Sequence, residues 1–279
     1  MKIKRNQAVL FILLALAALL LAACGGGATA TAEATLESGA EAGTDSGAEA
    51  EADTSVEAPA TGSGLCANPY YPVIEGVSHN YHGVSTDSEF TFTSTISGVR
   101  EDGFTLTSEF DGVTVTQEWA CTAEGLMALT YGGGAAAAVS VTGSEATYET
   151  SDVTGVTLPT SIAAGDAWSQ TFVISGTQTI PGMEQAATVA GSASTSYAAL
   201  GEESVDTEAG TFTAMKVAVT HVLDLTVTVN GISTASQFTS TGHTWYVAGI
   251  GWVKSVDNAE IAGVAIESAI ELTAYSIPE

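Results

Sequence analysis

Apolar and polar residues alternate along most of the chain after residue 65, with the period of two that is typical of strands. Thr, Val and Ser recur in these segments, and the first two favour strands because their branched side chains fit a pleated surface. Glu-Asp-Gly, Asp-Gly and Asn-Gly separate several of the segments and are typical of hairpin turns. The pattern predicts strands at 88–96, 103–110, 112–119, 212–229, 232–247 and 259–277.

The clearest hairpin signal is Asn230–Gly231, which lies between two long alternating segments. No segment after residue 65 has the period of an amphipathic helix. The Ala-rich segment 132–139 comes nearest, but its glycines favour a strand or a loop. We therefore predict an all-β fold of antiparallel strands.

Two segments, 118–129 and 244–255, align without gaps and suggest an internal duplication. Segments 71–81 and 158–172 support it, because each carries a proline, then a glycine, then an aromatic ring. The residues that define the repeat are Trp119 and Gly125 in the first copy, and Trp245, Gly251 and Trp252 in the second.

This repeat predicts two diverged half-barrel-like units, a first β unit at 65–150 and a second at 151–279. In each unit a tryptophan ends a strand, and a glycine then allows the bulge or positive φ that restarts the next strand. We interpret these tryptophans as scaffold that seals the end of a sheet. The alternative is an aromatic platform for a ligand.

The N-terminus has the features of a targeting segment. Lys2, Lys4 and Arg5 precede the uninterrupted apolar run 8–23, which ends in Leu-Ala-Ala-Cys at Cys24. This arrangement resembles a bacterial lipobox, so we predict a lipoprotein signal peptide at 1–23 and a lipidated Cys24. The alternative is an uncleaved anchor helix, although the run is short of the ~20 residues that span a bilayer.

The segment after the lipobox, 24–64, has a different composition. Its Gly, Ala, Ser and Thr residues are accompanied by eight carboxylates and no positive charge. Such a sequence buries too little apolar surface to offset its ordering entropy, so we predict a disordered acidic tether with a reach of ~35 Å. A short helical patch at 47–52 is the alternative, although it is too short to persist alone.

The chain is strongly acidic, with a formal net charge of −26. Three of its six Lys and Arg residues lie in the predicted signal peptide, so the remaining chain carries 3 − 32 = −29. This charge argues against nucleic acid and against anionic lipid headgroups as partners.

Cys66 and Cys121 remain after Cys24 is assigned to lipidation. In an oxidising compartment an even pair predicts a disulfide, which would contribute ~4 kcal/mol in the chain-entropy model. A redox or metal pair is the alternative, but no Cys-x-x-Cys spacing or neighbouring histidine favours it.

Motifs for catalysis are absent from the sequence. No G-x-S-x-G, P-loop or dinucleotide fingerprint occurs, and the Asp-Gly turns lack the alternating ligands of a calcium loop. His79 and His82 would point to opposite faces of a strand, which disfavours a shared metal. Neither His221, near Asp224, nor His243 completes a recognisable site. We predict no enzyme activity, no metal site and no cofactor.

A Pro-x-x-x-Gly motif followed by an aromatic residue, "AGTFTAMKV" at 209–217 and "TWYVAGIGWVK" at 244–254 together resemble a group of uncharacterised bacterial lipoproteins. Some members of that group are similar to the half-open antiparallel barrels of periplasmic lipoprotein carriers. The second unit carries the resemblance best, because the first has His79 in place of Trp and lacks the Gly-Thr-Phe step. The resemblance implies a curved sheet and transfers no catalytic residue.

These observations predict a non-catalytic cell-envelope protein on the extracytoplasmic face, held to a membrane by Cys24. The leading hypothesis is that its curved sheet binds an apolar small molecule or lipid. The alternatives are a structural or protein-interaction lipoprotein, with a partner that the sequence does not name, and a hydrolase. A deep cavity with apolar walls from both units would favour ligand binding.

Overall fold

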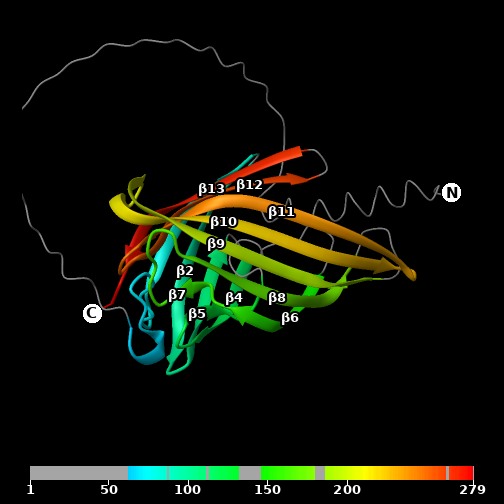
Figure 1. Cartoon of the computed structure of the whole chain (residues 1–279), viewed down its shortest axis with the longest axis horizontal. Coiled ribbons are helices and arrows are strands. Elements are labelled where there is room, and N and C mark those ends of the chain that lie inside the picture. Colours follow the sequence, from blue (N-terminus) through cyan, green and yellow to red (C-terminus); the bar gives the residue numbers. More distant parts are fainter. Residues whose placement is uncertain are drawn as a thin grey trace, which may run out of the picture.

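The computed structural model describes residues 62–86, 88–110, 113–131, 146–179, 186–261 and 264–278, and these form one continuous antiparallel sheet (Figure 1). The predicted all-β fold is thereby confirmed. The signal peptide, Cys24, nearly all of the tether and the segment 132–139 lie outside the described residues. Among the described residues, no helix has the length and apolar character needed to cross a membrane.

Within the described ranges, thirteen strands follow a short 3-10 turn, η2 (Gly64–Cys66). The strands are β1 (Ser78–Ser85), β2 (Ser88–Arg100), β3 (Gly103–Phe110), β4 (Val113–Cys121), β5 (Gly125–Ala128), β6 (Ala146–Gly155), β7 (Leu158–Pro159), β8 (Ala167–Gln178), β9 (Ala187–Thr207), β10 (Gly210–Val229), β11 (Ile232–Val247), β12 (Gly251–Ile261) and β13 (Val264–Ser276). Their order in the sheet is β6-β8-β9-β10-β11-β12-β13-β1-β2-β3-β4-β5-β7.

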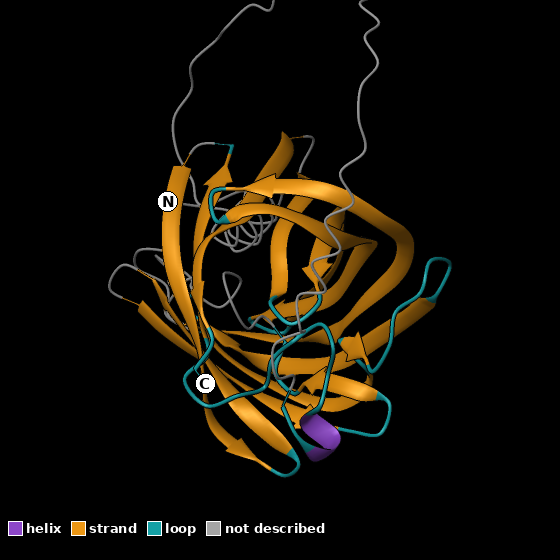
Figure 2. Ribbon diagram, turned by 90° about the vertical axis from the view of Figure 1, so that its left-hand side faces the viewer, coloured by secondary structure: helices purple, strands orange, loops and turns teal. Residues whose placement is uncertain are grey.

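The strands bend around a common interior, as Figure 2 shows. Register shifts interrupt five of the strand pairs, including those between Lys216 and Val217 and between Trp245 and Tyr246. An extra residue in one strand bends it and increases its twist, so these shifts help the sheet to curve. Alternation then directs every second side chain into the interior, as in the burial pattern of β1.

The predicted hairpin at Asn230–Gly231 is confirmed, because Val229 pairs with Ile232 and both turn residues have positive φ. The prediction of one strand over 259–277 is wrong. The chain reverses between Ile261 and Val264, which pair with each other, so β12 and β13 form a hairpin. The apolar pattern continues through this reversal. The only local sequence signal for the turn is Gly263.

The sheet does not stop at the boundary predicted between the two units. That boundary falls inside β6, which pairs with β8. Strand β1 also pairs with β13, which joins the beginning of the first predicted unit to the end of the second. The 65–150 and 151–279 units stay a prediction about ancestry, within a sheet that is structurally continuous.

One end of the interior is filled by the segment 66–77, which we call the plug. Tyr71, Val73 and Val77 are buried there against residues from strands far apart in the sheet, among them Phe104 and Tyr246. The fully buried Asn68 donates a hydrogen bond from Nδ2 to the Pro159 carbonyl, at 2.8 Å. A disulfide joins Cys66 to Cys121 and ties the plug to β4.

Strands β5 and β8, which each pair with an edge strand of the sheet, are joined along a seam. Thr157 Oγ1 accepts a hydrogen bond from the Ala128 N–H at 2.9 Å and donates to Gln170 Oε1 at 2.6 Å. Gln170, which is 1% exposed, donates from Nε2 to the Ala128 carbonyl at 2.8 Å. These bonds, together with a backbone bond from the Thr157 N–H to the Leu126 carbonyl at 2.9 Å, link β5 to β8.

Candidate functional site

Beyond the plug, the curved sheet surrounds a half-open cavity of about 490 Å³. Strands β2–β5 and β8–β13 all contribute to its wall. Apolar side chains come from both predicted units, including Phe92 and Leu106 from the first and Val219, Leu223 and Ile266 from the second. This volume falls within the range of small-molecule sites, roughly 300–1,000 Å³.

Several polar groups in the cavity wall form hydrogen bonds with one another or with the backbone. The hydroxyls of Ser94 and Ser108 form a hydrogen bond of 2.8 Å. Gln117 donates to the Thr130 carbonyl at 2.8 Å. His221 Nδ1 lies 2.9 Å from Thr195 Oγ1, and burial lowers the pKa of His221, which favours the neutral imidazole.

Asp257 differs from these groups in being an acid without a partner. It projects from β12, and its register partners are Gly242 on β11 and Ser268 on β13. Among the described residues no side chain or backbone group forms a hydrogen bond or ion pair with its carboxylate. Gly242 makes room for it, since a Cβ at position 242 would lie 2.5 Å from Asp257 Oδ1 and would clash with the Val256 carbonyl.

Burial raises the pKa of Asp257 to about 6, because the carboxylate has lost much of its hydration. No Lys or Arg is among the described residues that line the cavity, and Asp257 is the only carboxylate there. At neutral pH the cavity therefore holds one negative charge with no cation to balance it.

The tryptophans of the predicted repeat take different positions. Trp119 and Trp252 border the cavity, so two of the three tryptophans interpreted as scaffold form part of the candidate site. Trp245 lies on the other side of the sheet, where its Nε1 donates to Glu203 Oε1 at 2.7 Å and Lys216 Nζ lies 5.1 Å from its ring. The gap-free alignment thus pairs Trp119 with a tryptophan on the opposite face.

The glycines of the repeat do occupy similar positions. Gly125 and Gly251 each begin a strand, and both have positive φ, at 146° and 118°. A Cβ at Gly125 would clash with the Leu158 carbonyl, so only glycine fits there. The register shift between Trp245 and Tyr246 explains how the glycines match while the tryptophans do not.

His79 and His82 point to opposite faces of β1, as the sequence predicts for an i, i+3 pair. His79 is 1% exposed, and its Nε2 donates to the Ile250 carbonyl at 2.6 Å. Its Nδ1 is buried without a partner among the described residues, and burial lowers its pKa. Asp224 does not join His221, because it lies on the exposed side and accepts a hydrogen bond from Gln237.

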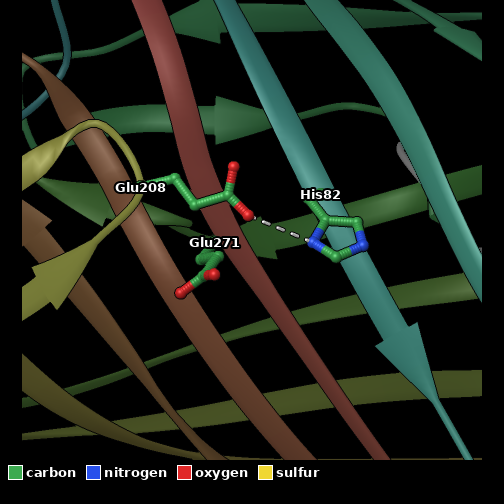
Figure 3. Close-up of side chains that lie close together, drawn as sticks. All are labelled: His82, Glu208 and Glu271. Atoms are coloured by element: carbon green, nitrogen blue, oxygen red, sulfur yellow. Dashed lines mark ion pairs between the residues drawn. The ribbon is translucent and has the colours of Figure 1, made fainter.

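His82 belongs to a cluster on the outer face, shown in Figure 3, that sequence analysis missed. It is the register partner of Glu271 on β13. Glu208, in the turn between β9 and β10, reaches over both, and its Oε1 lies 3.6 Å from His82 Nδ1. The sequence held no signal for this cluster, because its three members are far apart along the chain.

An imidazole nitrogen and two carboxylates are groups that divalent metals accept, and their ligand atoms lie within 4.8 Å of one another. Lys254, however, already places its Nζ 3.7 Å from Glu271 Oε2. The Ala209 N–H also donates to the Leu272 carbonyl at 3.1 Å, which docks the same turn on β13. We assign the cluster a structural role, as a clasp that holds the β9–β10 turn on the sheet.

No protein-family model and no curated protein sequence matches the chain. Among solved structures it is similar to a candidate exported protein with a YmcC-like fold from Bacteroides fragilis, at 13% identity and a TM-score of 0.47 over 75% of this chain and 100% of that chain. It is similar to a candidate lipoprotein from Parabacteroides distasonis at 15% identity and a TM-score of 0.42, over 75% and 99% of the two chains. The hypothetical lipoprotein YmcC from Escherichia coli is similar at 12% identity and a TM-score of 0.31, over 73% and 86%.

The resemblance to uncharacterised lipoproteins stays a prediction from the sequence motifs.

Proposed function

We propose that the protein is a lipid-anchored envelope protein that binds an apolar small molecule inside its curved sheet. The observation that carries the ligand-binding part is the cavity of about 490 Å³, with apolar walls from both halves of the chain. A sheet that served only as a scaffold would gain stability from filling this space, because interiors are normally close-packed.

The plug supports this proposal. It fills one end of the interior, where it packs against Tyr246, and Tyr246 in turn lines the cavity at the other end. Ser94 and Ser108 in the wall are already hydrogen-bonded to each other, and apolar side chains from both halves of the chain surround them. An apolar ligand would displace water from these apolar parts of the wall.

Support for the anchor comes from the sequence. The positive residues, the apolar run 8–23 and Cys24 follow one another at the spacing of a lipobox. The acidic tether would then hold the sheet away from the lipid surface. We propose no catalytic function. In the described cavity wall, Asp257 has no hydrogen-bond partner and His221 is paired with Thr195, so the two do not form an acid–base pair.

Native mass spectrometry tests the ligand-binding part. The chain from residue 25 to 279 would be exported into an oxidising compartment without the lipid, purified without detergent and extracted with organic solvent. We expect an adduct of lipid-like mass, or binding of added alkyl compounds that tightens about fourfold per methylene, at about 0.8 kcal/mol each. A bare mass that takes up no alkyl compound would favour the structural or protein-binding alternative.

Membrane fractionation tests the anchor separately. A Cys24→Ser chain should lose acylation, as measured by metabolic labelling with an alkyne fatty acid, while a Cys66→Ser chain should keep it. Acylation that survives Cys24→Ser would contradict the lipoprotein assignment and leave the cavity proposal untouched.

A further inference from the structure

The unpaired carboxylate of Asp257 gives the cavity a chemical preference. We propose that the ligand is an amphiphile whose head group is a protonated amine, and that Asp257 receives this group. This inference rests on the ligand-binding function proposed above and names the class of ligand.

The position of Asp257 fits this role. It lies in the cavity wall, and no described Lys or Arg lines the same cavity. Its Oδ1 occupies the space that a side chain at position 242 would otherwise fill. Ser268 is its register partner on β13 and also lines the cavity. Directly opposed side chains in antiparallel strands have Cβ atoms about 5 Å apart, so both can accept from one ammonium group with three N–H donors.

Charge decides among possible head groups. A carboxylate, phosphate or sulfate would place a second negative charge beside Asp257, in a cavity lined by no described Lys or Arg and in a chain of net charge −26. Removing like charges from water without a counter-ion is costly. A neutral alcohol donates one hydrogen bond and leaves the carboxylate charge unbalanced, whereas an ammonium group balances it.

The neighbouring groups do not supply that balance. Strands β11 and β13 flank β12, and Tyr246 is the only titratable residue that they direct into the cavity. Burial raises its pKa far above the ordinary value of 10, so it stays neutral. His221, on β10, is also favoured as neutral because burial lowers its pKa.

The rest of the ligand would meet an apolar surface. Phe92, Leu106, Phe172, Leu223 and Ile266 come from five different strands and surround the cavity. A linear or cyclic hydrocarbon therefore suits the space, with a single charged end at Asp257.

Three probes that share one alkyl chain test the inference on the unchanged 25–279 chain: dodecylamine, dodecanol and dodecanoate. Calorimetry at pH 8 and low salt would measure each affinity, below the micelle concentrations of dodecylamine and dodecanoate and below the solubility limit of dodecanol. We expect dodecylamine to bind about tenfold more tightly than dodecanol, equal to about 1.4 kcal/mol, and dodecanoate to bind most weakly.

Asp257→Asn keeps the size of the side chain and removes its charge. It should reduce the preference for dodecylamine over dodecanol to about one, with dodecanol binding unchanged or tighter. The matched control is Asp224→Asn on the exposed side of β10, which should keep the tenfold preference although it changes the net charge equally.

The outcomes separate the two proposals. If dodecanol or dodecanoate binds as tightly as dodecylamine to the unchanged chain, or if Asp257→Asn keeps the preference, the amine inference is overturned while ligand binding stands. If none of the three probes binds, the ligand-binding function itself is overturned. The comparison of the probes needs no variant, so it holds even if a substitution prevents folding.

Discussion

The two ends of the interior are built from the same strands and differ in what fills them. At the plug end, rings of Tyr71, Phe104 and Trp119 lie 5.5–6.2 Å apart, and the interior is closed. At the other end the strands continue, but side chains of similar size surround a cavity. The difference shows that the sheet creates a space, and that the segment before β1 determines how much of it remains.

The titratable groups at the two ends differ in the same way. His79 is enclosed near the plug, and its lowered pKa means that stability falls as the pH drops below the ordinary value of 6.5. Asp257 faces the cavity, and its raised pKa means that stability increases as the pH falls. The first group belongs to the packed core, whereas the second carries an uncompensated charge that a ligand could use.

Removing one phenylalanine from each end should show the largest difference. Phe104 is 0% exposed. Phe104→Ala should therefore lower the free energy of unfolding by about 3–5 kcal/mol, because the substitution leaves a new void in a packed core. Phe172→Ala should cost less, because this ring already lacks packing partners on its cavity side. Denaturant unfolding measures both, and equal losses would contradict the distinction between the ends.

Removing the disulfide should cause the second-largest loss in the free energy of unfolding. A Cys66→Ser, Cys121→Ser chain loses a link between residues 55 apart, and we expect a loss of up to about 4 kcal/mol in the free energy of unfolding. Reduction of the unchanged chain should have a similar effect and serves as the control. A full-sized loss with no change in amide exchange of residues 66–77 would refute the role of the disulfide in holding the plug.

Asp257→Asn should act in the opposite direction. Folding raises the pKa of this carboxyl from an ordinary 3.8 to about 6, so the folded protein holds the proton more tightly than the unfolded chain. The charged form therefore destabilises the fold above pH 6, by at most about 3 kcal/mol at 1.36 kcal/mol per pH unit. We expect Asp257→Asn to raise stability at pH 8 and to lose this gain as the pH falls from 6 to 3.8.

Unfolding curves at pH 8, 6 and 4 measure the effect, with Asp224→Asn as the exposed control. A substitution at Asp257 that destabilises the fold equally at all three values would show that the carboxylate has a partner there.

The smallest effect is expected outside the interior, at the clasp of His82, Glu208 and Glu271. Glu208 is 58% exposed at its side chain, so Glu208→Gln should change stability by about 1 kcal/mol or less, and less still at high salt. Thermal unfolding at two salt concentrations measures this. A loss of several kcal/mol that zinc or another divalent ion modulates would replace the clasp with a metal site.

Local signals predicted the strands wherever they were strong. The segments 103–110 and 232–247 coincide with β3 and β11, because their alternation is bounded by turn residues on both sides. Strand β9 (Ala187–Thr207) was not predicted, because its run of Ala, Ser and Gly has little β-propensity, and its long pairings with β8 and β10 hold it in place.

The candidate site was predicted only as a general property, a concave apolar face, and none of its polar residues was identified. Asp257 is one of 32 acidic residues, and nothing nearby in the sequence separates it from the solvated ones. Its environment comes from Gly242 and Ser268 on neighbouring strands and from the absence of described cations across the cavity. These are tertiary facts, since they depend on register.

The sequence by itself determined the all-β class, the Asn-Gly hairpin and the pairing of Cys66 with Cys121, and it predicted the export signal. These features depend on local periodicity, turn chemistry and composition, which a linear chain displays directly. Only the tertiary structure decided that all strands join one sheet, that the plug fills one end, and that Asp257 is left alone in the cavity. Those outcomes depend on curvature and strand register, which bring distant residues together and set the hydration of each charge.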